Sequence, residues 1–70
     1  MKYTQAEQRQ IARSATRSQL RRNGTDPETV TVAVALIVLD ELARRDSSLV
    51  ASIWYENASD NQIRLFKREW

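Results

Sequence analysis

The chain has 70 residues, with no cysteine, no histidine and a single glycine, and its formal net charge is +2. It can therefore form neither a disulfide nor a zinc site of the Cys/His type, and it lacks the commonest general base and thiol nucleophile of enzymes. One glycine is too few for a glycine-rich phosphate loop. We expect no catalysis, no metal and no cofactor. The length predicts one domain over residues 1–70.

The charge of the chain is unevenly distributed. Residues 1–24 carry six basic side chains and one acidic side chain, whereas residues 25–70 carry five basic and eight acidic ones. Such an asymmetry concentrates positive potential in one part of the molecule, and it indicates a partner that is negatively charged.

A first helix is predicted over residues 4–23. The segment contains no proline or glycine and several good helix formers. Thr4 and Glu7 have the spacing of a capping box, and Asn23-Gly24 is a typical helix stop, so the helix should end near Arg22.

This first helix carries a row of arginines at i, i+4 spacing, and we call Arg9, Arg13, Arg17 and Arg21 the arginine row. Three interpretations of the row remain open. It can be a solvated face, paired with acidic residues of the next helix. It can bind the phosphates of DNA or RNA, or it can bind an acidic protein surface. The candidate partner-binding residues are Arg9, Arg13, Arg17, Arg21 and Arg22.

The segment 26–46 contains the only long apolar run, and we expect the rest of the domain to pack around it. Its alternating valines have the period of a strand. The ends favour a helix, because Thr25 or Asp26 can serve as N-cap and Pro27 fits a first helical turn. We predict a central helix over about residues 27–45.

The predicted central helix has apolar residues on more than one side. One broad face runs from Val32 to Ala43 and should point into the bundle. A smaller apolar patch on the opposite side must be covered by the first helix or by a second copy of the chain. Because a small chain without cross-links gains buried area by self-association, we predict a homodimer with Val30, Val34 and Ile37 in its interface.

Two short helices should follow. The Asp-Ser-Ser sequence at residues 46–48 supplies a break and an N-cap for the first of them, and Ser59 with Gln62 caps the second, at residues 60–69. Each helix has an apolar stripe that we expect to face the bundle. The stripes are Leu49, Val50, Ile53 and Trp54 in the first helix, and Ile63, Phe66 and Trp70 in the second.

The aromatic residues near the end of the sequence have two interpretations. The simpler one places them in or beside the core. The other makes Trp54, Tyr55 and Trp70 a contact surface, because Trp and Tyr are favoured at protein interfaces.

The sequence therefore predicts an all-α protein, a bundle of three to four helices around a central apolar helix at about residues 27–45, and we expect it to be dimeric. The ten-residue apolar run is too short to cross a bilayer and the first residues lack an apolar signal region, so we expect a cytoplasmic protein with no membrane contact. The expected function is non-enzymatic: a small accessory or regulatory module, of the size common in phages and mobile elements, that docks on another protein. The alternative is a dimeric DNA- or RNA-binding regulator that uses the first helix.

Overall fold

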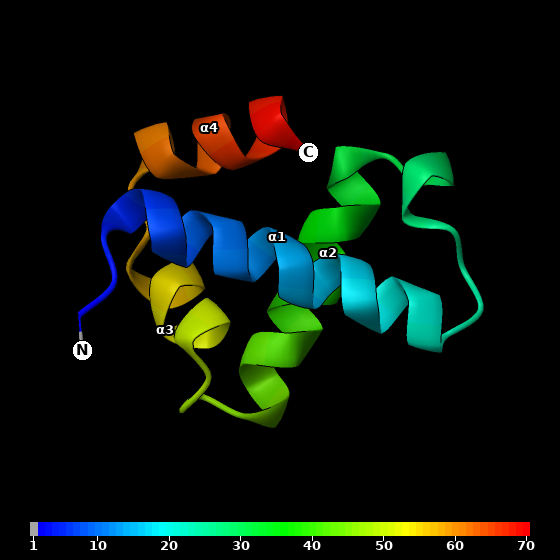
Figure 1. The fold of residues 1–70 in the computed structure, drawn as a ribbon, viewed down its shortest axis with the longest axis horizontal. Coiled ribbons are helices and arrows are strands. Elements are labelled where there is room, and N and C mark those ends of the chain that lie inside the picture. Colours follow the sequence, from blue (N-terminus) through cyan, green and yellow to red (C-terminus); the bar gives the residue numbers. More distant parts are fainter. Residues whose placement is uncertain (1) are drawn as a thin grey trace.

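Helix α1, Gln5–Arg22, crosses the middle of the computed structural model, which describes residues 2–70 (Figure 1). It contacts every other helical element, with α3 on one side and α4 on the other. The part of the chain that the model describes contains no strand, so the all-α prediction is confirmed. The other elements are the 3₁₀ helix η1 (Pro27–Thr29), α2 (Val32–Arg45), α3 (Val50–Asn57) and α4 (Asp60–Glu69).

Helix α1 begins and ends where the sequence predicts. The Thr4 backbone N–H donates to the Glu7 carboxylate at 3.0 Å, and the Glu7 backbone N–H donates to the Thr4 hydroxyl at 3.1 Å, which completes the capping box. After Asn23, Gly24 has a φ of 78°, a left-handed conformation that glycine adopts without steric cost. Both ends of α1 are therefore determined by local sequence.

Helix α2 begins at Val32, five residues later than predicted. Asp26 and Pro27 do start a helical turn, but that turn is η1 and lasts only three residues. Val30 and Thr31 then adopt extended backbone angles, and the Thr31 hydroxyl accepts a hydrogen bond from the Val34 N–H at 3.4 Å. The prediction from residue 27 was wrong because a second N-cap interrupts the segment.

The two faces of α2 lie as its helical periodicity predicts. The side that faces the other helices includes Ala35, Leu39, Leu42 and Ala43, all of them buried. On the opposite side, Ala33, Val34 and Ile37 are exposed, and Val30 just before the helix is half-buried.

The core lies where α1, α2, α3 and α4 meet. Its largest side chains, Trp54, Phe66 and Leu39, are each at most 1% exposed. Helix α1 contributes the small residues Ala12 and Thr16, both fully buried, and these let the neighbouring helices approach its backbone closely. The close approach explains why α1 contacts all the other helical elements although its own apolar face is poor. Helix α2 packs on α1 and α3.

The starts of the last two helices differ in their capping. Helix α4 begins as predicted, with the Ser59 hydroxyl accepting from the Gln62 N–H at 3.3 Å. The expected cap of α3 is wrong: its N-cap is Leu49, which makes no side-chain capping bond. Asp46 instead closes its own turn by accepting from the Ser48 N–H at 3.0 Å and from its hydroxyl at 2.6 Å. Among residues 2–70, none of the helices has the length and apolarity needed to cross a membrane.

Candidate interaction surfaces

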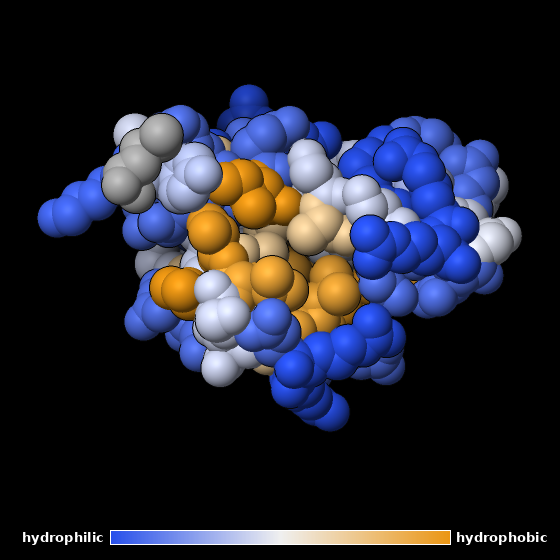
Figure 2. All heavy atoms as spheres, turned by 60° about the horizontal axis from the view of Figure 1, so that its bottom comes forward, coloured by the Kyte–Doolittle hydropathy of each residue, from blue (hydrophilic) through white to orange (hydrophobic). Residues whose placement is uncertain are grey.

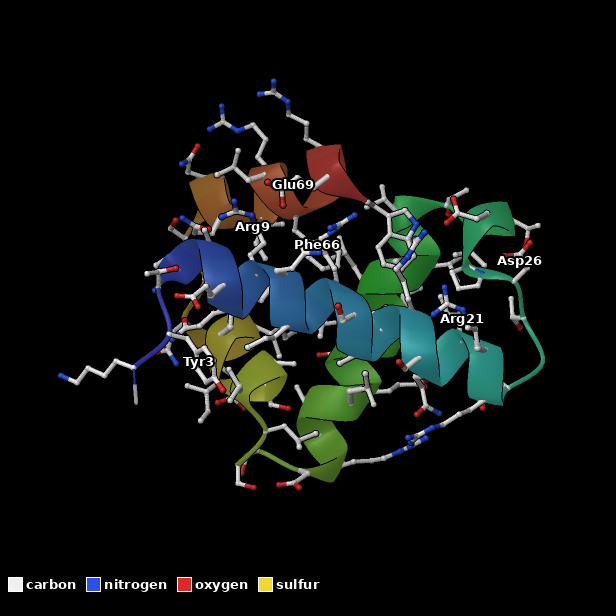
Figure 3. All side chains as sticks on the ribbon, viewed as in Figure 1. Tyr3, Arg9, Arg21, Asp26, Phe66 and Glu69 are labelled. Atoms are coloured by element: carbon white, nitrogen blue, oxygen red, sulfur yellow. The ribbon has the colours of Figure 1, made fainter. Side chains whose placement is uncertain are left out.

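The first two arginines of the arginine row reach from α1 to α4. Arg9 donates to both carboxylate oxygens of Glu69, from Nε at 2.9 Å and from Nη2 at 3.0 Å, and the two side chains point toward one another in Figure 3. Its Nη1 also donates to Gln62 at 2.7 Å. Arg13 donates to the Gln10 side chain at 2.7 Å and to the backbone carbonyl of Glu69. These two guanidinium groups therefore already have partners inside the chain.

The C-terminal part of α1 carries one paired arginine and two exposed ones. Arg17 forms an ion pair with Glu28, donates to the Trp70 carbonyl at 3.4 Å, and lies 4.9 Å from the centre of the Trp70 ring. Arg21 and Arg22 are exposed, and neither has an ion-pair partner within residues 2–70.

Three of the five candidate binding residues thus have partners within the chain, which agrees with the interpretation of the row as a paired face. The predicted pairing with an acidic residue near the central helix is present as Arg17–Glu28. The pairing of Arg9 with Glu69, sixty residues away, was not predicted, because it depends on the placement of α4 across α1.

The carboxylate of Glu69 is stabilised in its charged form. Hydrogen bonds from Arg9 hold its pKa below the ordinary value of 4.5, although desolvation opposes them. The charges of Arg9, Arg13 and Arg68 also lower the pKa, each by less. Its folded pKa is thus lower than its unfolded pKa. The contribution to stability is complete above the unfolded pKa, near 4.5, and it is lost as pH falls through the folded pKa.

Stability should therefore decrease on acidification below about pH 4.5, and Glu69→Gln should make that decrease smaller. Urea unfolding at pH 7 and at pH 3 gives the free energy of unfolding of the wild type and of the variant. The difference between the two proteins should be smaller at pH 3 than at pH 7. Glu56→Gln is a matched control, since Glu56 is exposed and forms no ion pair within residues 2–70. An unchanged pH dependence in Glu69→Gln would show that the Arg9–Glu69 pair does not stabilise the fold.

Two shallow grooves follow the exposed face of α1 and share a wall made of Gln10, Ser14 and Ser18. The apolar groove has a volume of about 470 Å³, and its remaining lining consists of Tyr3, Glu7, Ile11 and Ala15. The cationic groove has a volume of about 290 Å³, and its remaining lining consists of Arg13, Arg17 and Arg21. Sequence reasoning missed the apolar groove and Gln10. The signal was the i, i+4 spacing of residues 10, 14 and 18 beside the arginine row.

The predicted dimer residues of α2 are only partly covered. Ile37 is 60% exposed and Val34 is 41% exposed, while Val30 is half-buried. The first helix therefore does not cover this patch, which was one of the two predicted arrangements. We call Val30, Val34 and Ile37 the α2 apolar stripe.

A second apolar area was not predicted. Leu49 and Ile53 were expected to face the bundle, but they are 42% and 47% exposed. Because α3 contributes Ala51, Ser52 and Trp54 to the interior, residues 49 and 53 are turned outward on the helix. Figure 2 shows apolar side chains gathered on the side of the molecule where α3 lies, bordered by hydrophilic side chains.

The aromatic contact surface proposed from the sequence is wrong for Trp54, which is 1% exposed and lies in the core. Its ring centre is 5.7 Å from that of Phe66. Tyr55 is half-buried against the core. Trp70 is also half-buried and stacks on Phe66 with ring centres 5.9 Å apart. These contacts agree with the simpler interpretation, in which the aromatic residues belong to the core and its edge.

Helix α4 has a basic outer face. Arg64, Lys67 and Arg68 are exposed, and none of them forms an ion pair within residues 2–70. The opposite face of α4 holds the buried Phe66, so the two sides of the helix differ sharply in polarity. These three cations were not among the predicted binding residues, which all lie on α1.

The described residues contain no group of three or more acidic side chains placed to hold a metal ion. Comparison with models of protein families, with curated proteins and with solved structures finds no match for this chain. The interaction surfaces of α1, α2 and α4 are therefore the basis for inferring a function.

Proposed function

We propose that the chain is a non-enzymatic interaction domain that acts as a homodimer and docks on a protein with an acidic surface. The observation that carries this proposal is the exposure of Val34 and Ile37 on a helix whose other face already completes a core. A solvated apolar stripe on an otherwise well-packed helix favours contact with a second apolar surface.

The proposed dimer joins two copies of the α2 apolar stripe across a two-fold axis, as in most homodimers. In such an interface each copy contributes the same surface, so the α2 apolar stripe of one copy is covered by the α2 apolar stripe of the other. Charged residues border the stripe at its C-terminal end, where Glu41 and Arg45 are exposed and unpaired within residues 2–70. In an antiparallel pair of helices the C-terminal end of each stripe lies beside the N-terminal end of the other, so these charges lie at the rim of the proposed interface.

Ile37→Glu should convert the dimer into a monomer. Each of the two symmetry-related isoleucines loses about 1.5–3 kcal/mol of apolar burial, so the dimer should weaken more than about a hundredfold. Light scattering after size exclusion measures the change as a fall from two chains of 8.1 kDa to one. The matched control is Ile53→Glu, which places the same charge at an exposed isoleucine of α3. A wild-type protein that remains a single chain at high concentration contradicts the dimer.

Docking on a protein is tested by affinity capture from an extract of the native host, with and without nuclease. The proposal is supported if a host protein stays bound to the immobilised domain after nuclease treatment and is released when free domain is added. Retention that is abolished by nuclease favours the second candidate function, binding to DNA or RNA. The observation that favours this alternative is a set of exposed cations that have no acidic partner within residues 2–70: Arg21, Arg22, Arg64, Lys67 and Arg68.

A further inference from the structure

The two grooves of α1 form one composite surface, because they share the wall of Gln10, Ser14 and Ser18. Apolar contacts are available on one side of this wall and three arginines on the other. None of the residues that line the cationic groove is acidic. A ligand that lies along α1 therefore meets apolar surface and positive charge side by side over several helical turns.

The cationic groove is largely preorganised. Arg13 is held by Gln10 and by the Glu69 carbonyl, and Arg17 is held by Glu28 and the Trp70 ring. Fixing these long side chains before binding reduces the conformational entropy that a ligand must remove.

We propose that this composite surface binds an acidic amphipathic helix of the partner protein, an inference that rests on the proposed docking function. Apolar side chains of that helix occupy the apolar groove, and carboxylates at i, i+4 spacing face Arg13, Arg17 and Arg21. The spacing of successive arginines in the row, about 6 Å along the helix axis, equals that of carboxylates one turn apart on the bound helix.

Two observations favour a protein ligand over a nucleic acid. The apolar groove offers nothing to a phosphate backbone, and Glu7 in its lining repels phosphate. Hydrogen bonds within the capping box lower the pKa of Glu7, so this carboxylate is charged at neutral pH.

The probe is a fluorescein-labelled helical peptide as long as α1, with leucines along one face and glutamates along the adjacent face, and binding to the full chain is measured by anisotropy. Arg21→Glu should weaken binding about tenfold. Arg22→Glu makes the same charge change at an exposed residue outside both grooves and should have a much smaller effect. Tyr3→Ser should weaken binding several-fold, since it removes the exposed ring from the apolar groove.

Circular dichroism of each variant shows whether its fold is retained. Equal losses in Arg21→Glu and Arg22→Glu, no binding of the peptide, or equal binding of a scrambled peptide of the same composition would overturn the proposal. Tighter binding of a labelled DNA duplex than of the peptide would also overturn it, in favour of nucleic acid. Protein capture that survives nuclease while the peptide fails to bind would leave the docking function standing and reject only this surface.

Discussion

Phe66→Ala should lower the free energy of unfolding by about 3–5 kcal/mol. The Phe66 side chain is fully buried between Trp54 and Trp70, with ring centres 5.7 Å and 5.9 Å away. Its removal leaves a cavity and ends two aromatic contacts. A 70-residue domain has a total stability of about 4–10 kcal/mol, so the loss is a third of the total or more. The variant should be partly unfolded at room temperature, with α4 detached first.

Urea unfolding followed by tryptophan fluorescence measures this change, because Trp54 and Trp70 are on either side of the substituted ring. Lys67→Ala is the matched control on α4: Lys67 is exposed, and its truncation should change stability by less than about 0.5 kcal/mol. Equal losses in the two variants would mean that Phe66 is not the anchor of α4. The ion pair of Arg9 with Glu69 alone would not hold this helix, since exposed ion pairs contribute little.

The ends of helices that depend on hydrogen bonds between nearby residues were predicted from the sequence. Helices α1 and α4 begin at side-chain caps, Thr4 and Ser59, and α1 ends before a glycine, so their bounds follow from short-range hydrogen bonds. The start of α2 was not predictable in this way. Asp26 and Thr31 are both acceptable N-caps, and the chain uses both, the first for η1 and the second for α2.

The interaction surfaces were harder to predict, because they depend on distant contacts. Nothing near Arg9 in the sequence indicates that Glu69 will bind it, so the arginine row looked more accessible than it is. Likewise, the importance of α1 comes from Ala12 and Thr16, small side chains whose burial a count of large apolar residues does not detect. By contrast, the exposure of Val34 and Ile37 follows from helical periodicity alone.

That periodicity leads to the last prediction, which compares two neighbouring apolar residues of α2. Leu39→Ala should destabilise the protein by about 2–5 kcal/mol, because Leu39 is fully buried in the core. Ile37→Ala should change the stability of the monomer by less than about 0.5 kcal/mol, because Ile37 is 60% exposed. Chemical unfolding at a protein concentration below the dimer dissociation constant separates this effect from self-association.

The same pair of variants decides between the two interpretations of the apolar run. In a strand, residues 37 and 39 lie on the same face, so both truncations would have similar costs. In a helix they lie about 200° apart, and only one can face the core. A ratio of costs near one would therefore contradict the helical register of α2, and with it the α2 apolar stripe on which the proposed dimer depends. A large cost at Leu39 alone leaves Ile37 available for a second copy of the chain.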